Sequence, residues 1–162
     1  MTRVSAFFSI HQTNNRIMKK IFVAICVVLM GCNGVSAHDV MITVNQLPAM
    51  SQTFLTTYFD GVQVSYVTED RTAGITTGYE VRLVNGVEIE FERSGDLHQI
   101  ECKTVVMPEG IVPAPIMNYV RTNFQNMDIK EYKVKRFFIE VKLINGLELE
   151  FDKDYNFVGV DD

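Results

Sequence analysis

The chain has 162 residues, of which 47% are hydrophobic and 22% are charged, and its formal net charge is −5. A disordered or collagen-like chain is excluded, because glycine contributes only 10 residues and proline only 4. Residues 38–162 hold all 20 acidic residues but only 11 of the 15 basic ones, so we expect no nucleic-acid partner, since such partners require clustered Lys and Arg.

Residues 1–37 have the three-part pattern of a secretory signal peptide, with the functional start at Met18. A short basic region precedes an apolar run at 21–30, which is about half the length of a membrane-spanning helix. The tetrapeptide that ends at Cys32 also resembles a bacterial lipobox, so cleavage after Ala37 and lipidation at Cys32 both stay open. We therefore expect a periplasmic or secreted protein, or a lipoprotein whose only membrane contact is through Cys32.

The mature chain contains one pattern twice. Residues 80–91 and 140–151 match at all twelve positions, by identity or conservative replacement, at an offset of 60. Pro48 and Pro113 stand before similar stretches at an offset of 65. Because such self-similarity indicates a repeat architecture, we predict a duplicated unit with about five extra residues in the first copy.

The domain is expected to span 38–162, with repeat one at 45–106 and repeat two at 111–162. We place the extra residues of repeat one in the polar stretch 67–78. Ahead of the first repeat, the dipeptide at 38–39 is expected to be a mobile chain end.

Each copy is predicted to begin with a short amphipathic helix at its proline, since the first turn of a helix does not need the N–H that proline lacks. Helical spacing of apolar residues then defines the buried face. The residues expected on that face are Met50, Phe54, Leu55 and Tyr58 in the first helix and Ile116, Met117, Val120 and Phe124 in the second.

Strict alternation of apolar and polar residues after each helix predicts a hairpin of half-buried strands. The Asn-Gly dipeptide that ends at Gly86 alone favours a two-residue turn, but this turn would place Leu83 opposite Glu88. A three-residue turn pairs Leu83 with Val87 and gathers the apolar side chains on one face. We therefore predict a type I turn followed by a left-handed glycine, at Gly86 and again at Gly146.

Further strands are predicted before each hairpin, at 63–67 and 129–134, and after it, from Leu97 and from Phe157. The fold class is thus α+β, with two tandem repeats that each pack a short helix on a three- to four-stranded antiparallel meander.

The sequence of Pro-Ala, a helix that ends in Phe, and a strand pair around Asn-Gly resembles the PepSY-like periplasmic proteins of Bacteroides-type bacteria. The resemblance covers about residues 45–161 and implies a fold like that of the beta-lactamase inhibitor protein. It implies a non-catalytic envelope binding module, which inhibits or regulates a peptidase or another periplasmic enzyme. The alternative is a periplasmic protein that binds a small ligand or an ion.

No pattern predicts a catalytic residue, a cofactor or a metal site. The acids of each hairpin alternate as on any solvated strand face. Cys102 and His98 are about 13 Å apart along a predicted strand, too far for a nucleophilic pair, so Cys102 is expected to be a packed thiol. The acids at 152 and 154 lack the glycine of a calcium loop, and a polar turn is the better interpretation.

A basic and aromatic segment in repeat two is the candidate surface for an envelope protein partner. The family often places a Trp in the strand after the helix, where this chain has tyrosines. The candidate partner-binding residues are Lys133, Lys135, Arg136, Phe138, Tyr66 and Tyr132. The alternative is an edge strand that its lysines protect from aggregation.

Overall fold

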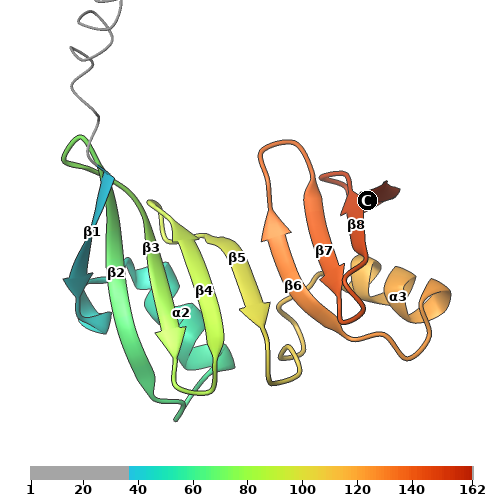
Figure 1. Cartoon of the computed structure of the whole chain (residues 1–162), viewed down its shortest axis with the longest axis horizontal. Helices are drawn as coiled ribbons and strands as arrows, with labels where there is room; N and C mark the ends of the chain where they lie inside the picture. Colours follow the sequence, from blue (N-terminus) through green and yellow to red (C-terminus); the bar gives the residue numbers. More distant parts are fainter. Residues whose placement is uncertain (1–36, 162) are drawn as a thin grey trace, which may run out of the picture. The chain divides into compact units, whose positions relative to one another are not determined.

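The computed structural model describes residues 37–161, and in this part of the chain two α-helices lie against a nine-stranded sheet (Figure 1). Residues 1–36 of the predicted signal peptide, including Met18 and Cys32, lie outside the described residues. Within the described region, no helix has the length and apolarity needed to cross a membrane. The elements are β1 (Ala37–Ile42), the 3-10 helix η1 (Val44–Gln46), α2 (Ala49–Tyr58), β2 (Val64–Thr72), β3 (Ile75–Leu83), β4 (Val87–Glu92), β5 (Leu97–Cys102), α3 (Ala114–Asn123), β6 (Ile129–Val134), β7 (Ile139–Leu143), β8 (Glu148–Phe151) and β9 (Phe157–Asp161).

The strands follow one another across the sheet in the order of the sequence, and every neighbouring pair is antiparallel. Strands β2–β5 follow α2, and strands β6–β9 follow α3. The pairing of β5 with β6, in which Ile100 lies opposite Tyr132, joins the two groups edge to edge. Two helices on an antiparallel sheet agree with the predicted α+β class, while the duplication stays a prediction.

Both helices cover the same face of the sheet. Phe54 of α2 meets Phe91 of β4, and Tyr119 of α3 meets Phe151 of β8, with ring centroids 5.5 Å apart in each pair. A row of buried side chains runs along this inner face from strand to strand: Val81, Ile89, Ile100, Tyr132, Val141 and Leu149. Because apolar burial is the main stabilising term in folding, this row is the core that holds the sheet to its helices.

The three-residue turns are confirmed. Val81 lies opposite Ile89, a register that sets Leu83 against Val87, and Gly86 has φ +86°. The N–H of Gly86 donates to the carbonyl of Leu83 at 3.0 Å. The second hairpin has the same geometry, with φ +91° at Gly146. The length of the turn is therefore set by the need to place the apolar side chains of both strands on one face, although the Asn-Gly dipeptide alone favours a two-residue turn.

The predicted helix faces are correct for Leu55, Ile116 and Val120, which are buried. The prediction is wrong for Met50, whose side chain is exposed. Ser51 is buried in its place, because its side of α2 rests on the turn between β4 and β5. A small polar side chain fits there, whereas Met would not.

The sequence patterns do not predict β1. The dipeptide at 38–39, expected to be a mobile chain end, is part of this strand. His38 pairs with Arg71, and Asp39 pairs with Asp70. The extra residues of the first half lengthen β2 and β3 to nine residues each, against six and five in β6 and β7. Residues 37–39 of β1 pair with this extension, whereas residues 40–42 pair with the part of β2 that corresponds to β6.

Candidate functional site

The outer face of the sheet, opposite the helices, carries charged side chains that are largely paired. Arg82 forms an ion pair with Glu88, and Lys142 forms one with Glu148 at the corresponding place of the second hairpin. Lys103 lies 3.2 Å from Glu101. These ion pairs of the hairpin acids agree with the interpretation of a solvated strand face.

Residues 135–138, which connect β6 to β7 and are called the basic loop here, differ from the rest of this face. Lys135 forms an ion pair with Glu140 and lies 4.9 Å from the ring centroid of Phe138. Arg136 lies 5.0 Å from the ring centroid of Phe137, whose side chain is 73% exposed. Arginine and aromatic side chains are enriched in binding hot spots, and a cation over an aromatic ring adds to the attraction between them.

The neighbouring β8–β9 turn adds to this basic end of the sheet. The ammonium of Lys153 donates to the backbone carbonyl of Lys135, so the turn and the basic loop lie together. Tyr155 of the same turn is partly exposed and has φ +68°. The carboxylate of Asp152 accepts hydrogen bonds from the side-chain amide of Asn156 at 3.0 Å and from its backbone N–H at 2.8 Å, and these bonds lower the pKa of Asp152. The segment is therefore a polar turn, as expected.

The structure brings together only part of the predicted set. Lys135, Arg136 and Phe138 lie in the basic loop, and Lys133 precedes it on the outer face of β6, opposite Glu140. Tyr132 points to the inner face and is buried, and burial raises the pKa of its hydroxyl to about 12. In this structure Tyr132 is a core residue.

Tyr66 lies apart from the basic loop. It belongs to β2, four strands from β6, a separation of about 19 Å at the usual strand spacing. Its hydroxyl donates to Glu80 at 2.9 Å, and its ring lies under Arg82. Tyr66 is thus fixed within the first half and does not share a surface with the basic loop.

Cys102 is buried, as expected for a packed thiol. Burial raises the pKa of this thiol to about 11, which keeps it protonated and unreactive at neutral pH. His98 faces another group, since its Nδ1 lies 2.9 Å from a carboxylate oxygen of Glu92. The described residues therefore contain no Cys–His pair at this strand.

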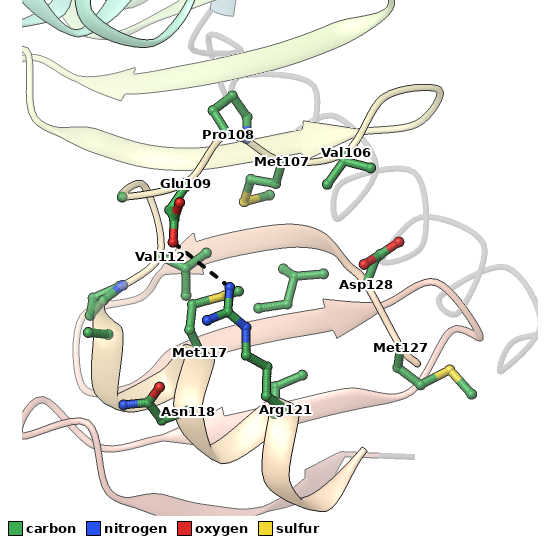
Figure 2. Close-up of a pocket in the computed structure, with 15 residues that line it drawn as sticks. Val106, Met107, Pro108, Glu109, Val112, Met117, Asn118, Arg121, Met127 and Asp128 are labelled. Carbon is green, nitrogen blue, oxygen red and sulfur yellow. Dashed lines mark ion pairs between the residues drawn. The ribbon is translucent and has the colours of Figure 1, made fainter. Parts of the chain in front are cut away.

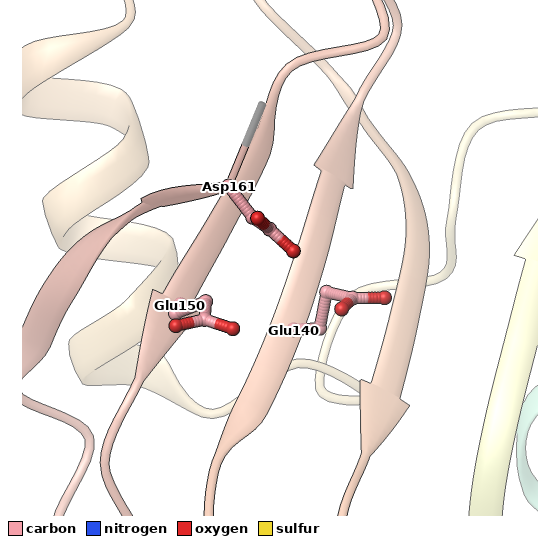
Figure 3. Close-up of side chains that lie close together, drawn as sticks. All are labelled: Glu140, Glu150 and Asp161. Carbon is pink, nitrogen blue, oxygen red and sulfur yellow. The ribbon is translucent and has the colours of Figure 1, made fainter.

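Three carboxylates gather on the outer face near the β9 edge (Figure 3). Oxygens of Glu140, Glu150 and Asp161 all lie within 4.8 Å of one another. Glu140 and Glu150 are directly paired across β7 and β8, which the predicted turn already implies. Asp161 joins them through the register of β9, which the sequence does not reveal. Carboxylate oxygens are the ligands that Ca²⁺ prefers, so this cluster could supply part of a cation site.

A cavity of about 680 Å³ lies beside α3 (Figure 2). Met107, Met117 and Met127 contribute to its apolar lining, and Arg121 and Glu109 face each other across it at 4.0 Å. Its size falls in the range of small-ligand sites. The sequence analysis missed this cavity, and the three methionines from separate segments were the available signal.

Comparison with known proteins places this geometry in a family. The family model described as "Putative beta-lactamase-inhibitor-like, PepSY-like" matches residues 77–159. A solved structure of a "putative periplasmic protein" of the DUF2874 family from Bacteroides vulgatus is 32% identical, with a TM-score of 0.71, and the match covers 82% of this chain and 100% of that one.

A "putative calcium-regulated periplasmic protein" from Bacteroides thetaiotaomicron is 31% identical, with a TM-score of 0.72. That match covers 76% of this chain and 97% of the relative. No curated protein matches the chain. The matched length, the identities and the shared fold show that the chain belongs to the PepSY-like, beta-lactamase-inhibitor-like family.

Proposed function

We propose that this chain is a non-catalytic binding module of the periplasm, which docks onto another envelope protein and inhibits or regulates it. A peptidase or another secreted enzyme is the partner class that fits best. The family description supports a binding role, and the relatives described as periplasmic support the location. A signal peptide over residues 1–37, with cleavage after Ala37 or lipidation at Cys32, belongs to the same proposal.

The observation that carries the proposal is the exposed Phe137 beneath Arg136 in the basic loop. An aromatic ring that is 73% exposed gains free energy when a partner covers it, and the adjacent guanidinium can pair with a carboxylate of that partner. Lys153 extends the positive charge. The partner is therefore expected to present an acidic and apolar patch.

Site-specific crosslinking in the bacterium tests this surface. A photoreactive phenylalanine at position 137 should trap one envelope protein, whereas the same group at position 84, which is also an exposed apolar position, should not. The trapped protein, once purified, should bind Arg136→Glu at least about tenfold more weakly than the wild type. Arg93→Glu, in the β4–β5 turn, is the matched control and should bind normally.

The proposal fails if crosslinking at 137 and at 84 yields the same proteins. It also fails if Arg136→Glu and Arg93→Glu bind the trapped protein equally well.

A second candidate function is calcium binding at the Glu140, Glu150 and Asp161 cluster. It is favoured by the three converging carboxylates and by the description of one relative as calcium-regulated. The ion would have to displace Lys135, which forms an ion pair with Glu140. Millimolar Ca²⁺ should then raise the melting temperature, because a ligand of the native state stabilises it. Glu150→Gln should abolish the rise, and Glu90→Gln, the corresponding change in the first hairpin, should not.

We infer further that residues 45–106 and 111–162 are copies of one unit. The helix-preceding residues Pro48 and Pro113 both have φ −54°. The strand irregularity between residues 90 and 91 recurs between residues 150 and 151, at the offset of 60 seen in the sequence.

A further inference from the structure

Strands β5 and β9 occupy corresponding places in the two halves. Each follows a turn after the second strand of its hairpin, and each pairs antiparallel with that strand. Ile100 lies opposite Ile89, and Val160 lies opposite Leu149, both on the inner face. The two strands can therefore be compared position by position.

Strands β5 and β9 differ at their second edge, which is the edge that faces away from the preceding hairpin. Strand β6 occupies the second edge of β5, where Tyr132 lies opposite Ile100. Among residues 37–161, no strand pairs with the second edge of β9. As a result Ile100 is 0% exposed, whereas Val160 is 46% exposed.

The β9 edge, Phe157–Asp161, carries neither lysine nor proline, two of the residues that commonly protect exposed edges. Such residues protect an edge because its unpaired N–H and C=O groups invite another strand. Val158 is also exposed, so the edge presents apolar side chains beside its free backbone groups.

Charge at this edge indicates what kind of strand fits. On the outer face, Asp161 and Glu150 belong to the three-carboxylate cluster, and within the described residues neither has a basic side chain within 4.0 Å. On the inner face, the exposed part of Val160 would be covered by an apolar side chain of an added strand. An incoming strand that alternates basic and apolar residues would satisfy both faces. At the corresponding edge of β5, Tyr132 lies opposite Ile100 and Lys130 lies 3.3 Å from Glu101, although Glu131 is the direct partner of Glu101 in the register.

We propose that the second edge of β9 binds an extended segment of a partner polypeptide by strand addition, and that this segment alternates Lys or Arg with apolar or aromatic residues. Main-chain hydrogen bonds would give affinity and the alternating side chains specificity. The proposal goes beyond the docking function of the basic loop and rests on different residues. A second copy of this chain is a poor occupant, since β9 against β9 would bring two acidic clusters together.

A blocked peptide of alternating lysine with valine or tyrosine is the probe, and the full-length protein is titrated with it. Binding should weaken at least about tenfold in Val160→Lys and in Asp161→Lys. Val84→Lys places the same change at an exposed position of the first half and should bind like the wild type. A peptide with glutamate in place of lysine should not bind.

Hydrogen exchange distinguishes strand addition from simple charge attraction. The probe should slow exchange of the β9 amides that face away from β8, while amides of the β6–β7 connection stay unchanged. The proposal is overturned if the probe does not bind, if Val160→Lys binds as well as Val84→Lys, or if β9 amides gain no protection. A dimer of the wild type that Val160→Lys dissociates would also overturn it, because the edge would then belong to a second copy. None of these outcomes depends on whether the basic loop docks a partner.

Discussion

The buried hydroxyl of Ser51 donates a hydrogen bond to the carbonyl of Gly95 across 3.1 Å, which ties α2 to the turn between β4 and β5. Gly95 has φ +94°, and a Cβ at this position would lie 2.6 Å from the Cβ of Pro48. The helix can approach the turn this closely only because residue 95 has no side chain.

Gly95→Ala should therefore destabilise the protein by about 2–4 kcal/mol, the sum of left-handed backbone strain and a steric clash. Gly146→Ala is the matched control, since Gly146 has φ +91° but no atom within 4 Å of an added Cβ. It should cost about 1–2 kcal/mol. Urea unfolding measures both changes in the free energy of unfolding. Equal decreases for the two variants would show that the contact with Pro48 does not contribute to the effect.

Ala73→Asn should stabilise the protein. The β2–β3 turn consists of Ala73 and Gly74, with φ +52° and +77°, which is the pattern of a two-residue type I′ turn. Alanine is strained in this conformation and asparagine tolerates it, so a gain of about 0.5–1 kcal/mol is expected. Ala73→Val should have the opposite sign in the same thermal or urea unfolding experiment, because a β-branched side chain is disfavoured at positive φ.

Glu131→Gln should stabilise the protein at neutral pH. Burial, reinforced by the charge of Glu101 on the neighbouring strand, raises the pKa of Glu131 above its ordinary value of 4.5. Protonated Glu131 contributes fully to the free energy of unfolding when the pH is below the ordinary pKa of 4.5. This contribution is lost as the pH rises through the raised pKa of the folded state. Ionised Glu131 thus costs stability at about pH 7.

The gain in melting temperature from Glu131→Gln should shrink as the pH falls towards about 4. Glu109→Gln is the control, because Glu109 is almost fully exposed and should have no comparable effect. A gain that is independent of pH would show that the charge of Glu131 is not its cause.

Cys102 should resist alkylation in the native protein and react after unfolding. The thiolate is the reactive form, and burial raises the pKa of this thiol to about 11. Iodoacetamide at about pH 8, followed by mass spectrometry of the peptide that contains Cys102, measures the modified fraction. Rapid labelling without denaturant would mean that β5 opens locally or that the thiol is accessible.

Alternation and turn geometry make the two hairpins predictable, because only one register gathers Leu83 and Val87 on the same face as their neighbours. The same argument separates Tyr132 from Lys133, since adjacent residues of a strand point to opposite faces. Tyr132 could therefore have been assigned to the core, and the pairing of Glu140 with Glu150 could have been read from the predicted turn.

Other features depend on contacts that local patterns do not encode. Strand β1 has no counterpart in the second half, and half of its pairing is with the extension of β2. The burial of Ser51 depends on Gly95, 44 residues away. The position of Asp161 beside Glu150 depends on the irregularity in β9. Each of these belongs to the tertiary structure, as does the cavity beside α3.

The strands lie side by side in the sheet in the same order as in the sequence, and this arrangement affects how the sheet can assemble. Each strand after β1 can pair with the strand synthesised just before it, so a polypeptide that leaves a channel with its amino-terminal end first can extend the sheet one strand at a time. Partners that are close in sequence also reduce the entropy lost on closing loops, which favours rapid folding and limits the time during which apolar strands stand uncovered.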